Sequence, residues 1–375
     1  MTSVCILTSA HSPFDTRIFH KQARTLQSEG YDVTLIAHHD RDEIRDGIQI
    51  DAIQPATSHF DRFLNLSKIY RAARKTKADV FHFHDPGLLP IGAALSVRTD
   101  AAVIYDCHEP YEVSFQHYDF PPDVLNPLIG NLYPYAQSGF CRPLDAVVAV
   151  TKWIQHDLQE LGHDPVHLIR NFPITQNIEI DSPPVERTHE FVLVYVGGLA
   201  QTRGLNVMID TLDHLRKMGV DASLWFLGGL SDNKKEKQAN SKVQARNLTN
   251  HVRFFGRVDH RDVFSYLAAA DVGLALLDPE FYNFGIPTKI FEYMFSSIPV
   301  VASDTVANAE YIPEQCGSLV PYDHPERIAT TLMELAENEE NRIVMGEVGR
   351  ELVEKQYSWE IERTQLLDLY ESVLE

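Results

Sequence analysis

Short apolar runs alternate with longer amphipathic segments along the whole chain. The first run is Val4-Cys-Ile-Leu-Thr, and a second at Val33–Ala37 follows a helical segment that stops at Gly30. Runs this short indicate buried strands, and strands that alternate with helices form parallel sheets with helices on both faces. The pattern predicts further strands at Val80–His84, Val103–Asp106, Val147–Val150 and His167–Ile169.

A polar, proline-bearing stretch from Pro173 to Arg187 separates this series from a second one. The second series begins with Val192-Leu-Val-Tyr-Val and predicts later strands at Leu224–Gly228, Val252–Phe255, Val272–Leu276 and Ile298–Ala302. A chain of 375 residues is long enough for two domains. We therefore expect two doubly wound α/β domains at residues 1–175 and 188–356, followed by a terminal segment at 357–375.

In such folds, ligands bind beyond the carboxyl ends of the strands. This rule gathers the following residues around one crevice of the first domain: Asp15, Arg17, His84, Asp85, His108 and Glu109. His82 and His84 share one face of a strand and could imitate a metal site together with Asp85 and His108. No HExxH-like spacing is present, so we expect no metal. The first loop also lacks G-x-G-x-x-G, which removes support for a dinucleotide site.

The stretch Phe281–Asp304 holds the most informative chemistry. A loop at 283–286 leads through Pro287 into a helix predicted at Lys289–Phe295, and free N–H groups at a helix start favour an anion. Thr288 and Lys289 add a hydroxyl and a cation there. Glu292 lies about one turn further on, where a carboxylate would accept hydrogen bonds from sugar hydroxyls. An anion site beside a diol site suits a nucleotide-sugar, and an ordinary helix–strand pair is the simpler alternative.

The segment PTKIFEYMFSSIPVVASD resembles the donor site of the retaining GT-B glycosyltransferases of family 4, the glycosyl transferases group 1. HSPFDTRIFHKQARTLQSEGYDVTLI resembles the opening of one branch of that family. Tyr357-Ser-Trp359 resembles the start of its last helix, which returns to the first domain. The resemblance covers essentially the whole chain. It implies a GT-B fold, with two Rossmann-like domains facing across a cleft, and transfer of a sugar from a nucleoside diphosphate to an acceptor hydroxyl.

Site residues follow from the same resemblance. Gly197-Gly198-Leu-Ala-Gln-Thr-Arg203 resembles the glycine-containing donor loop, although a plain βα turn is the alternative. The family commonly has an arginine and a lysine five positions apart in this loop. Those places are Gly198 and Arg203 here, and Lys289 would supply the second cation. The expected donor-binding residues are Gly197, Gly198, Arg203, Thr288, Lys289 and Glu292.

The expected catalytic residues are His108, Asp15, Arg203 and Lys289. The family carries a histidine at the position of His108, close to the transferred sugar, and the alternative is a histidine that ties a loop in place. Asp15 lies in a loop that faces the acceptor in the family, and its alternative role is to cap the helix that begins near Thr16. Arg203 and Lys289 are expected to stabilise charge on the leaving diphosphate.

The chain departs from the family at one further place. The family usually shows two glutamates with seven residues between them; the second is Glu292, and Phe284 stands at the first. The role of that first glutamate is therefore absent here or served by another residue. Two other functions stay open: a nucleotide-sugar 2-epimerase of similar architecture, and a degenerate homologue that binds the donor without turnover.

The net charge and composition of the chain limit the classes of partner that it is expected to bind. A net charge of −20 argues against general nucleic-acid binding. Four cysteines without a CxxC pair, no signal peptide and no apolar run of membrane-spanning length favour a cytoplasmic protein. The basic segment Arg62–Lys77 and the aromatic segment Tyr111–Phe140 would suit peripheral contact with the inner face of a membrane and a lipid-linked saccharide acceptor. A solvated helix beside a packed insert is the favoured alternative. Beyond the donor substrate we expect no cofactor.

Overall fold

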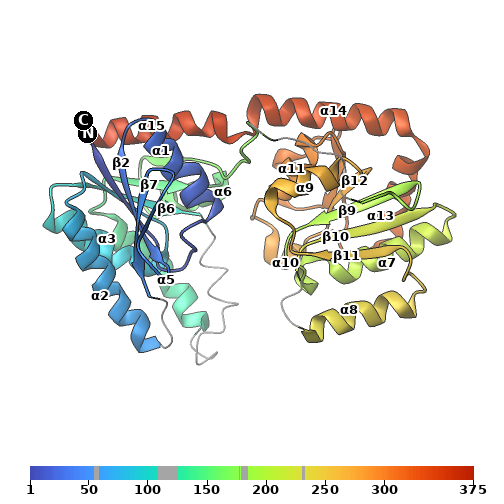
Figure 1. Ribbon diagram of the computed structural model, residues 1–375, viewed down its shortest axis with the longest axis horizontal. Coiled ribbons are helices and arrows are strands. Elements are labelled where there is room, and N and C mark those ends of the chain that lie inside the picture. The colour runs from blue at the N-terminus through green and yellow to red at the C-terminus, as the bar shows by residue number, and fades with distance from the viewer. Residues whose placement is uncertain (55–58, 109–125, 177, 179–184, 230–232) are drawn as a thin grey trace. The chain divides into compact units, whose positions relative to one another are not determined.

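The computed structural model describes residues 1–54, 59–108, 126–176, 178, 185–229 and 233–375 (Figure 1). The chain forms two compact units, Met1–Asn171 with Trp359–Glu375, and Phe172–Ser358. Glu109, half of the expected aromatic segment and part of the expected linker lie outside the described residues.

The first unit is built on an eight-stranded sheet. Its strands follow one another in this spatial order: β3 (Glu43–Arg45), β4 (Ile48–Ile53), β2 (Asp32–His38), β1 (Ser3–Leu7), β5 (Val80–Phe83), β6 (Ala102–Cys107), β7 (Ala146–Ala149) and β8 (Val166–Leu168). Every pairing is parallel except β3 with β4. The expected all-parallel sheet is therefore wrong at this edge. The sequence did not predict β3 and β4, because Ile48-Gln-Ile-Asp-Ala-Ile alternates with polar residues instead of forming an apolar run.

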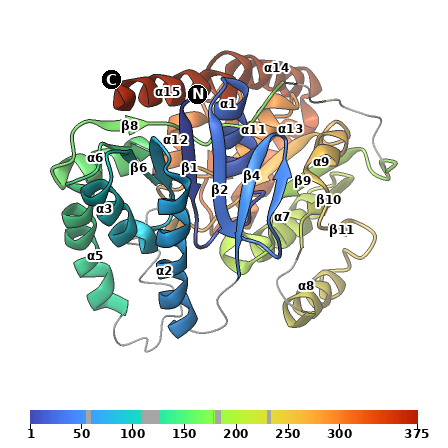
Figure 2. The same cartoon turned by 60° about the vertical axis from the view of Figure 1, so that its left-hand side comes forward.

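Helices cover this sheet. They are the π-helix η1 (Thr16–Ala23), α1 (Arg24–Ser28), α2 (His59–Thr76), the short η2 (Pro86–Leu88), α3 (Leu89–Arg98), α5 (Asn126–Cys141), α6 (Lys152–Glu160) and α15 (Trp359–Leu374). The last helix, α15, lies alongside α1 in both views (Figures 1 and 2). Trp359 at its start donates from Nε1 to Thr25 Oγ1 at 3.0 Å. Near its end the Tyr370 hydroxyl lies 2.9 Å from His82 Nδ1, so both ends of α15 are hydrogen-bonded to the first unit.

Removing the Tyr370 hydroxyl tests this attachment. Tyr370 and His82 are both fully buried, so Tyr370→Phe leaves the His82 nitrogen without its phenol. We expect a loss of about 1–3 kcal/mol in the free energy of unfolding of the first unit, the usual effect of stranding a buried polar group. Urea unfolding followed by fluorescence measures it, with Ser372→Ala on the same helix as the control. An unchanged midpoint would show that the contact adds nothing to stability.

The second unit has a six-stranded, all-parallel sheet. Its spatial order is β11 (Val252–Gly256), β10 (Ala222–Leu227), β9 (Phe191–Val196), β12 (Val272–Ala275), β13 (Val300–Ser303) and β14 (Gly317–Val320). This is the 3-2-1-4-5-6 order of a Rossmann fold, in which the winding reverses between β9 and β12. Leu193 and Tyr195 pack into the core on one face, and Val192 and Val194 into the core on the other. Both faces are therefore covered, as a doubly wound fold requires.

The helices of the second unit are η4 (Gln201–Arg203), α7 (Leu205–Lys217), α8 (Asn233–Ala245), α9 (His260–Leu267), α10 (Pro279–Tyr282), α11 (Lys289–Phe295), α12 (Val306–Tyr311), α13 (Pro325–Glu337) and α14 (Glu339–Gln356). Gly204 joins η4 to α7 with φ +75°, and a Cβ there would lie 1.9 Å from the backbone oxygen of Leu276. Only glycine fits this position, which fixes the close approach of the donor loop to the end of β12. Within the residues described, no helix is both long and apolar enough to span a bilayer.

Candidate active site

In the first unit, polar side chains meet where the winding of the sheet reverses, between β1 and β5. Asp85, just after β5, is buried and accepts from Thr8 Oγ1 at 2.9 Å and from the Ala10 amide at 3.1 Å. The Ser9 amide also donates to this carboxylate. Asp85 therefore fixes the loop that follows β1.

Three of the expected crevice residues are linked through His11, which the sequence did not single out. His11 Nε2 lies 3.3 Å from Asp85 Oδ1 and 3.1 Å from His108 Nε2. Its Nδ1 lies 3.8 Å from Asp15 Oδ2. Asp15 also caps η1, because its Oδ1 accepts from the amides of Arg17 and Ile18 at 2.8 and 3.0 Å. Asp15 thus forms the helix cap that was the alternative to its catalytic role, and its second carboxylate oxygen faces His11.

Arg17 and His84, two other residues expected around the crevice, are buried. Arg17 is buried and donates to Asp106 through Nε and Nη2, at 3.0 Å each. Gln22 Nε2 adds a third hydrogen bond to Asp106 at 2.6 Å. Burial by itself would raise the pKa of the Asp106 carboxyl, but Arg17 holds that pKa well below its usual range. Burial holds the pKa of His84 well below its ordinary value, so this histidine is neutral.

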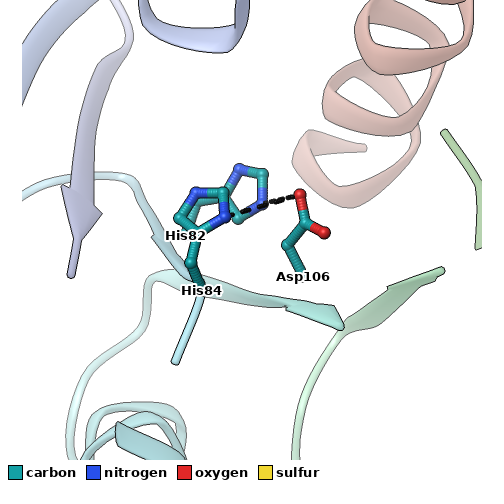
Figure 3. Close-up of side chains that lie close together, drawn as sticks. All are labelled: His82, His84 and Asp106. Atoms are coloured by element: carbon teal, nitrogen blue, oxygen red, sulfur yellow. Dashed lines mark ion pairs between the residues drawn. The ribbon is translucent and has the colours of Figure 1, made fainter. Parts of the chain in front are cut away.

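His82, His84 and Asp106 lie close enough together to suggest a metal site (Figure 3). His82 Nε2 and His84 Nδ1 lie 3.8 and 3.6 Å from Asp106 Oδ2. That oxygen already faces the Arg17 guanidinium, 2.8 Å from Nη2. A guanidinium in this place repels a divalent cation, so Asp106 fits a buried ion pair with Arg17 better than a metal site.

The glycine-containing loop of the second unit, which the sequence predicts to bind the donor, also lies where the winding reverses. Gly197 and Gly198 follow β9, and Gly197 has φ +124°. A Cβ at Gly197 would lie 3.4 Å from Lys289 Cε, and one at Gly198 would lie 3.3 Å from Arg203 Nη1. Each glycine therefore lies beside one cationic side chain, and the two cations come from segments 86 positions apart in the chain.

Two tyrosines hold these cations. Lys289 Nζ lies 4.9 Å above the ring of Tyr195, whose hydroxyl donates to Gly198 O at 3.0 Å. Arg203 Nε donates to the Tyr282 hydroxyl at 3.2 Å. Burial would lower the pKa of Arg203, but the two phenols raise it above its ordinary value, so the guanidinium stays charged. Burial raises the pKa of Tyr195 to about 12, which keeps this phenol neutral.

Lys289 has an unusual environment. It is buried at the start of α11, and burial followed by the charge of Arg203 lowers its pKa from 10.5 to about 8. Glu292, one turn further along α11, is also buried and acts in the opposite direction on that pKa. Arg203, Lys289 and Glu292 therefore lie within electrostatic range of one another, whereas Thr288 is exposed. Lys289 and Arg203 place two positive charges beside flexible glycine backbone, an arrangement suited to a diphosphate.

Comparison with known proteins supports a single family for both units. Residues 190–338 match the family Glycosyl transferases group 1, and residues 16–175 match Glycosyltransferase Family 4. The phosphatidyl-myo-inositol mannosyltransferase of Mycobacterium leprae is 30% identical over 307 residues, which cover 79% of this chain and 74% of that protein.

Solved structures agree on the fold. Sucrose-phosphate synthase from Thermosynechococcus elongatus superposes with a TM-score of 0.81 at 18% identity, over 100% of this chain and 99% of that one. HepE of Anabaena, in complex with UDP and glucose, superposes with a TM-score of 0.77 at 14% identity, over 99% of this chain and 100% of that one. The fold is GT-B. The chain belongs to the group 1, family 4 glycosyltransferases and is an enzyme of the hexosyltransferase type.

Proposed function

We propose that the protein transfers a hexosyl residue from a nucleoside-diphosphate sugar to the hydroxyl of a saccharide or lipid-linked saccharide, with retention of configuration. The product would enter cell-surface polysaccharide or glycoconjugate synthesis. The observation that carries this proposal is the placement of Lys289 beside Gly197 and of Arg203 beside Gly198, just after β9.

The reaction needs stabilisation of negative charge on the departing diphosphate. In the proposal, Arg203 and Lys289 supply it, and their geometry is set in advance by Tyr282 and Tyr195. Charges held in place before the reaction need no reorganisation as the glycosidic bond breaks. Gly197 and Gly198 let the backbone approach the phosphates, and the exposed Thr288 adds a hydroxyl. No divalent metal is assigned to this step, because the side-chain cations take its role.

On the first unit, His108 is assigned to the transferred sugar and Asp15 to the acceptor. The Mycobacterium leprae relative is named for a mannosyl transfer to phosphatidyl-myo-inositol, which makes a mannosyl donor and a lipid-linked acceptor the first candidates to test. Helix α2 carries exposed Lys68, Arg71 and Lys75 on the described part of its surface. Contact of α2 with an anionic membrane stays a prediction beside the simpler solvated helix.

A donor screen followed by product analysis tests the function. Binding of the correct nucleoside diphosphate, among those of uridine, guanosine and adenosine, should raise the melting temperature by mass action. The matching nucleotide-sugar should then release nucleoside diphosphate in an acceptor-dependent way. Acceptor-independent formation of an epimeric sugar would indicate a 2-epimerase instead. Binding without turnover across a panel of acceptors would indicate a degenerate homologue.

Glu292 is assigned to the ribose hydroxyls, and Glu292→Gln tests this role. The variant keeps the shape of the side chain but loses the charge that strengthens its hydrogen bonds, so we expect nucleotide affinity to fall roughly 10- to 100-fold. Calorimetry measures this change, with the exposed Glu347→Gln on α14 as the control. The variant and the native protein should bind a 2′,3′-dideoxynucleotide equally well. If Glu292→Gln also binds the dideoxynucleotide more weakly than the native protein does, Glu292 does not act through the ribose hydroxyls.

A further inference from the structure

His11 occupies the centre of the polar cluster on the first unit. Its two ring nitrogens face three functional groups: Nε2 faces His108 at 3.1 Å and Asp85 at 3.3 Å, and Nδ1 faces Asp15 at 3.8 Å. The rings of His11 and His108 meet edge to face, with centroids 4.9 Å apart. His11 therefore lies in direct contact with the histidine assigned to the sugar.

Asp85 gives His11 a rigid support. Its carboxylate is buried and is held by the Thr8 hydroxyl and by the amides of Ser9 and Ala10. These donors occupy Oδ2, and Oδ1 is the oxygen that faces His11. The hydrogen bonds with the loop amides hold the Asp85 carboxylate in place. Because Asp85 directly follows β5 and contacts His11, the carboxyl end of β5 positions the His11 ring.

This geometry favours one placement of the protons. A carboxylate accepts hydrogen bonds only, so Asp85 favours a hydrogen on the His11 nitrogen that lies 3.3 Å from it. With the hydrogen in that place, His108 Nε2, 3.1 Å from the same nitrogen, is the acceptor of the pair. A neutral histidine that accepts at Nε2 holds its proton on Nδ1. The contact with His11 therefore selects one of the two tautomers of His108.

We propose that Asp85 and His11 form a positioning pair that fixes the ring orientation and the Nδ1–H tautomer of His108. This inference rests on the proposed function, in which His108 meets the transferred sugar. His11 acts through His108, so it is a positioning residue, in the way that a hydrogen-bond partner on one ring nitrogen orients a functional histidine. The pair would thus fix the ring of His108 before the sugar arrives.

The tautomer can be measured without substrate. In protein labelled with ¹⁵N-histidine, the two ring nitrogens of each histidine give separate signals whose shifts report which one is protonated. His108→Asn identifies the His108 signals. We expect the Nδ1–H pattern for His108 in the native protein, and a mixture of both tautomers in His11→Ala. An Nε2–H pattern in the native protein would overturn the proposal.

A conservative variant separates positioning from simple packing. The glutamine side chain in His11→Gln carries an amide N–H at about the place of the histidine Nε2, so it should restore the Nδ1–H pattern of His108 and most of the turnover lost in His11→Ala. We expect kcat in His11→Ala to fall by up to about 100-fold, because small misplacements of a catalytic group have effects of that size. The KM for the donor should change little. His156→Ala, at an exposed histidine of α6, is the matched control.

Asp85→Asn serves as a second variant if His11→Ala does not fold. It removes the charge that holds the His11 proton, so His108 should again show both tautomers. Retention of a single Nδ1–H form in both variants, or equal losses in His11→Ala and His11→Gln, would refute the pair. These results are separable from the proposed function: a protein that transfers no sugar would refute the function, while the tautomer of His108 would still be measured.

Discussion

Arg203→Ala should lower kcat by about 100- to 1,000-fold, the usual effect of removing one preorganised donor from developing negative charge. The KM for the nucleotide-sugar should rise less, since the charge on the leaving diphosphate is greatest in the transition state. Steady-state kinetics with the donor found in the screen measures both constants. Turnover near the native value would remove Arg203 from the mechanism.

Two further variants sharpen this result. Arg203→Lys keeps a positive charge but loses the planar fork that donates to Tyr282 and is proposed to contact a phosphate, so it should recover only part of the lost rate. Tyr282→Phe keeps the ring and removes only the hydroxyl, and it should lower kcat less than Arg203→Ala does. Arg327→Ala, at an exposed arginine on α13, is the control for loss of charge from the second unit. A loss in Arg327→Ala equal to that in Arg203→Ala would indicate a general electrostatic effect and would leave the local role of Arg203 unsupported.

The sequence predicts the sheets well because buried parallel strands are continuous apolar runs. All the strands predicted from such runs are present, with ends shifted by one or two residues. The strands that were missed, β3, β4 and β14, are short or alternate with polar residues. The helix at Lys289–Phe295 has the bounds that its composition predicts, because Pro287 precedes it and apolar residues fill it.

The sequence predicts the site less well than the fold, because contacts between distant segments of the chain create the site. Tyr282 binds Arg203 across 79 positions of the chain, and Asp85 binds the loop after β1 across 75 to 77. Neither pair has a local spacing that sequence patterns could reveal. Tyr195 had a weak signal: on an alternating strand it lies on the same face as Gly197, the first glycine of the donor loop. His11 had only its place in a loop after a strand, which many residues share.

The buried Lys289 predicts a particular pH dependence of donor binding. Its pKa in the free protein is about 8, so the ammonium begins to lose its proton as pH rises through that value. A bound diphosphate favours the charged form and raises this pKa in the complex. Between the two pKa values binding takes up a proton, and the affinity for the nucleotide-sugar should fall by up to about tenfold per pH unit above pH 8. Nucleotide-sugars suit this test because their esterified diphosphate does not titrate near neutral pH.

Calorimetry in two buffers of different ionisation enthalpy measures the proton uptake directly. We expect uptake to be small at pH 7 and to approach one proton between pH 8 and 9. Lys289→Met should abolish the uptake, weaken donor binding and lower kcat by about 100-fold, as expected for the loss of a preorganised charge. Uptake that persists in Lys289→Met would assign the titration to another group.

The charge of Lys289 should favour donor binding but lower the stability of the unliganded protein. An unfolded lysine has its ordinary pKa of 10.5, whereas the folded protein holds Lys289 at about 8, so the folded state binds fewer protons between these values. The buried ammonium therefore destabilises the unliganded protein most fully below pH 8, and this penalty fades as pH rises toward 10.5. At pH 7, Lys289→Met should consequently melt at a higher temperature than the native protein while binding its donor more weakly. A lysine kept for structural reasons alone would give the reverse, a less stable variant with unchanged affinity, so one melting curve and one titration distinguish a functional charge from a structural one.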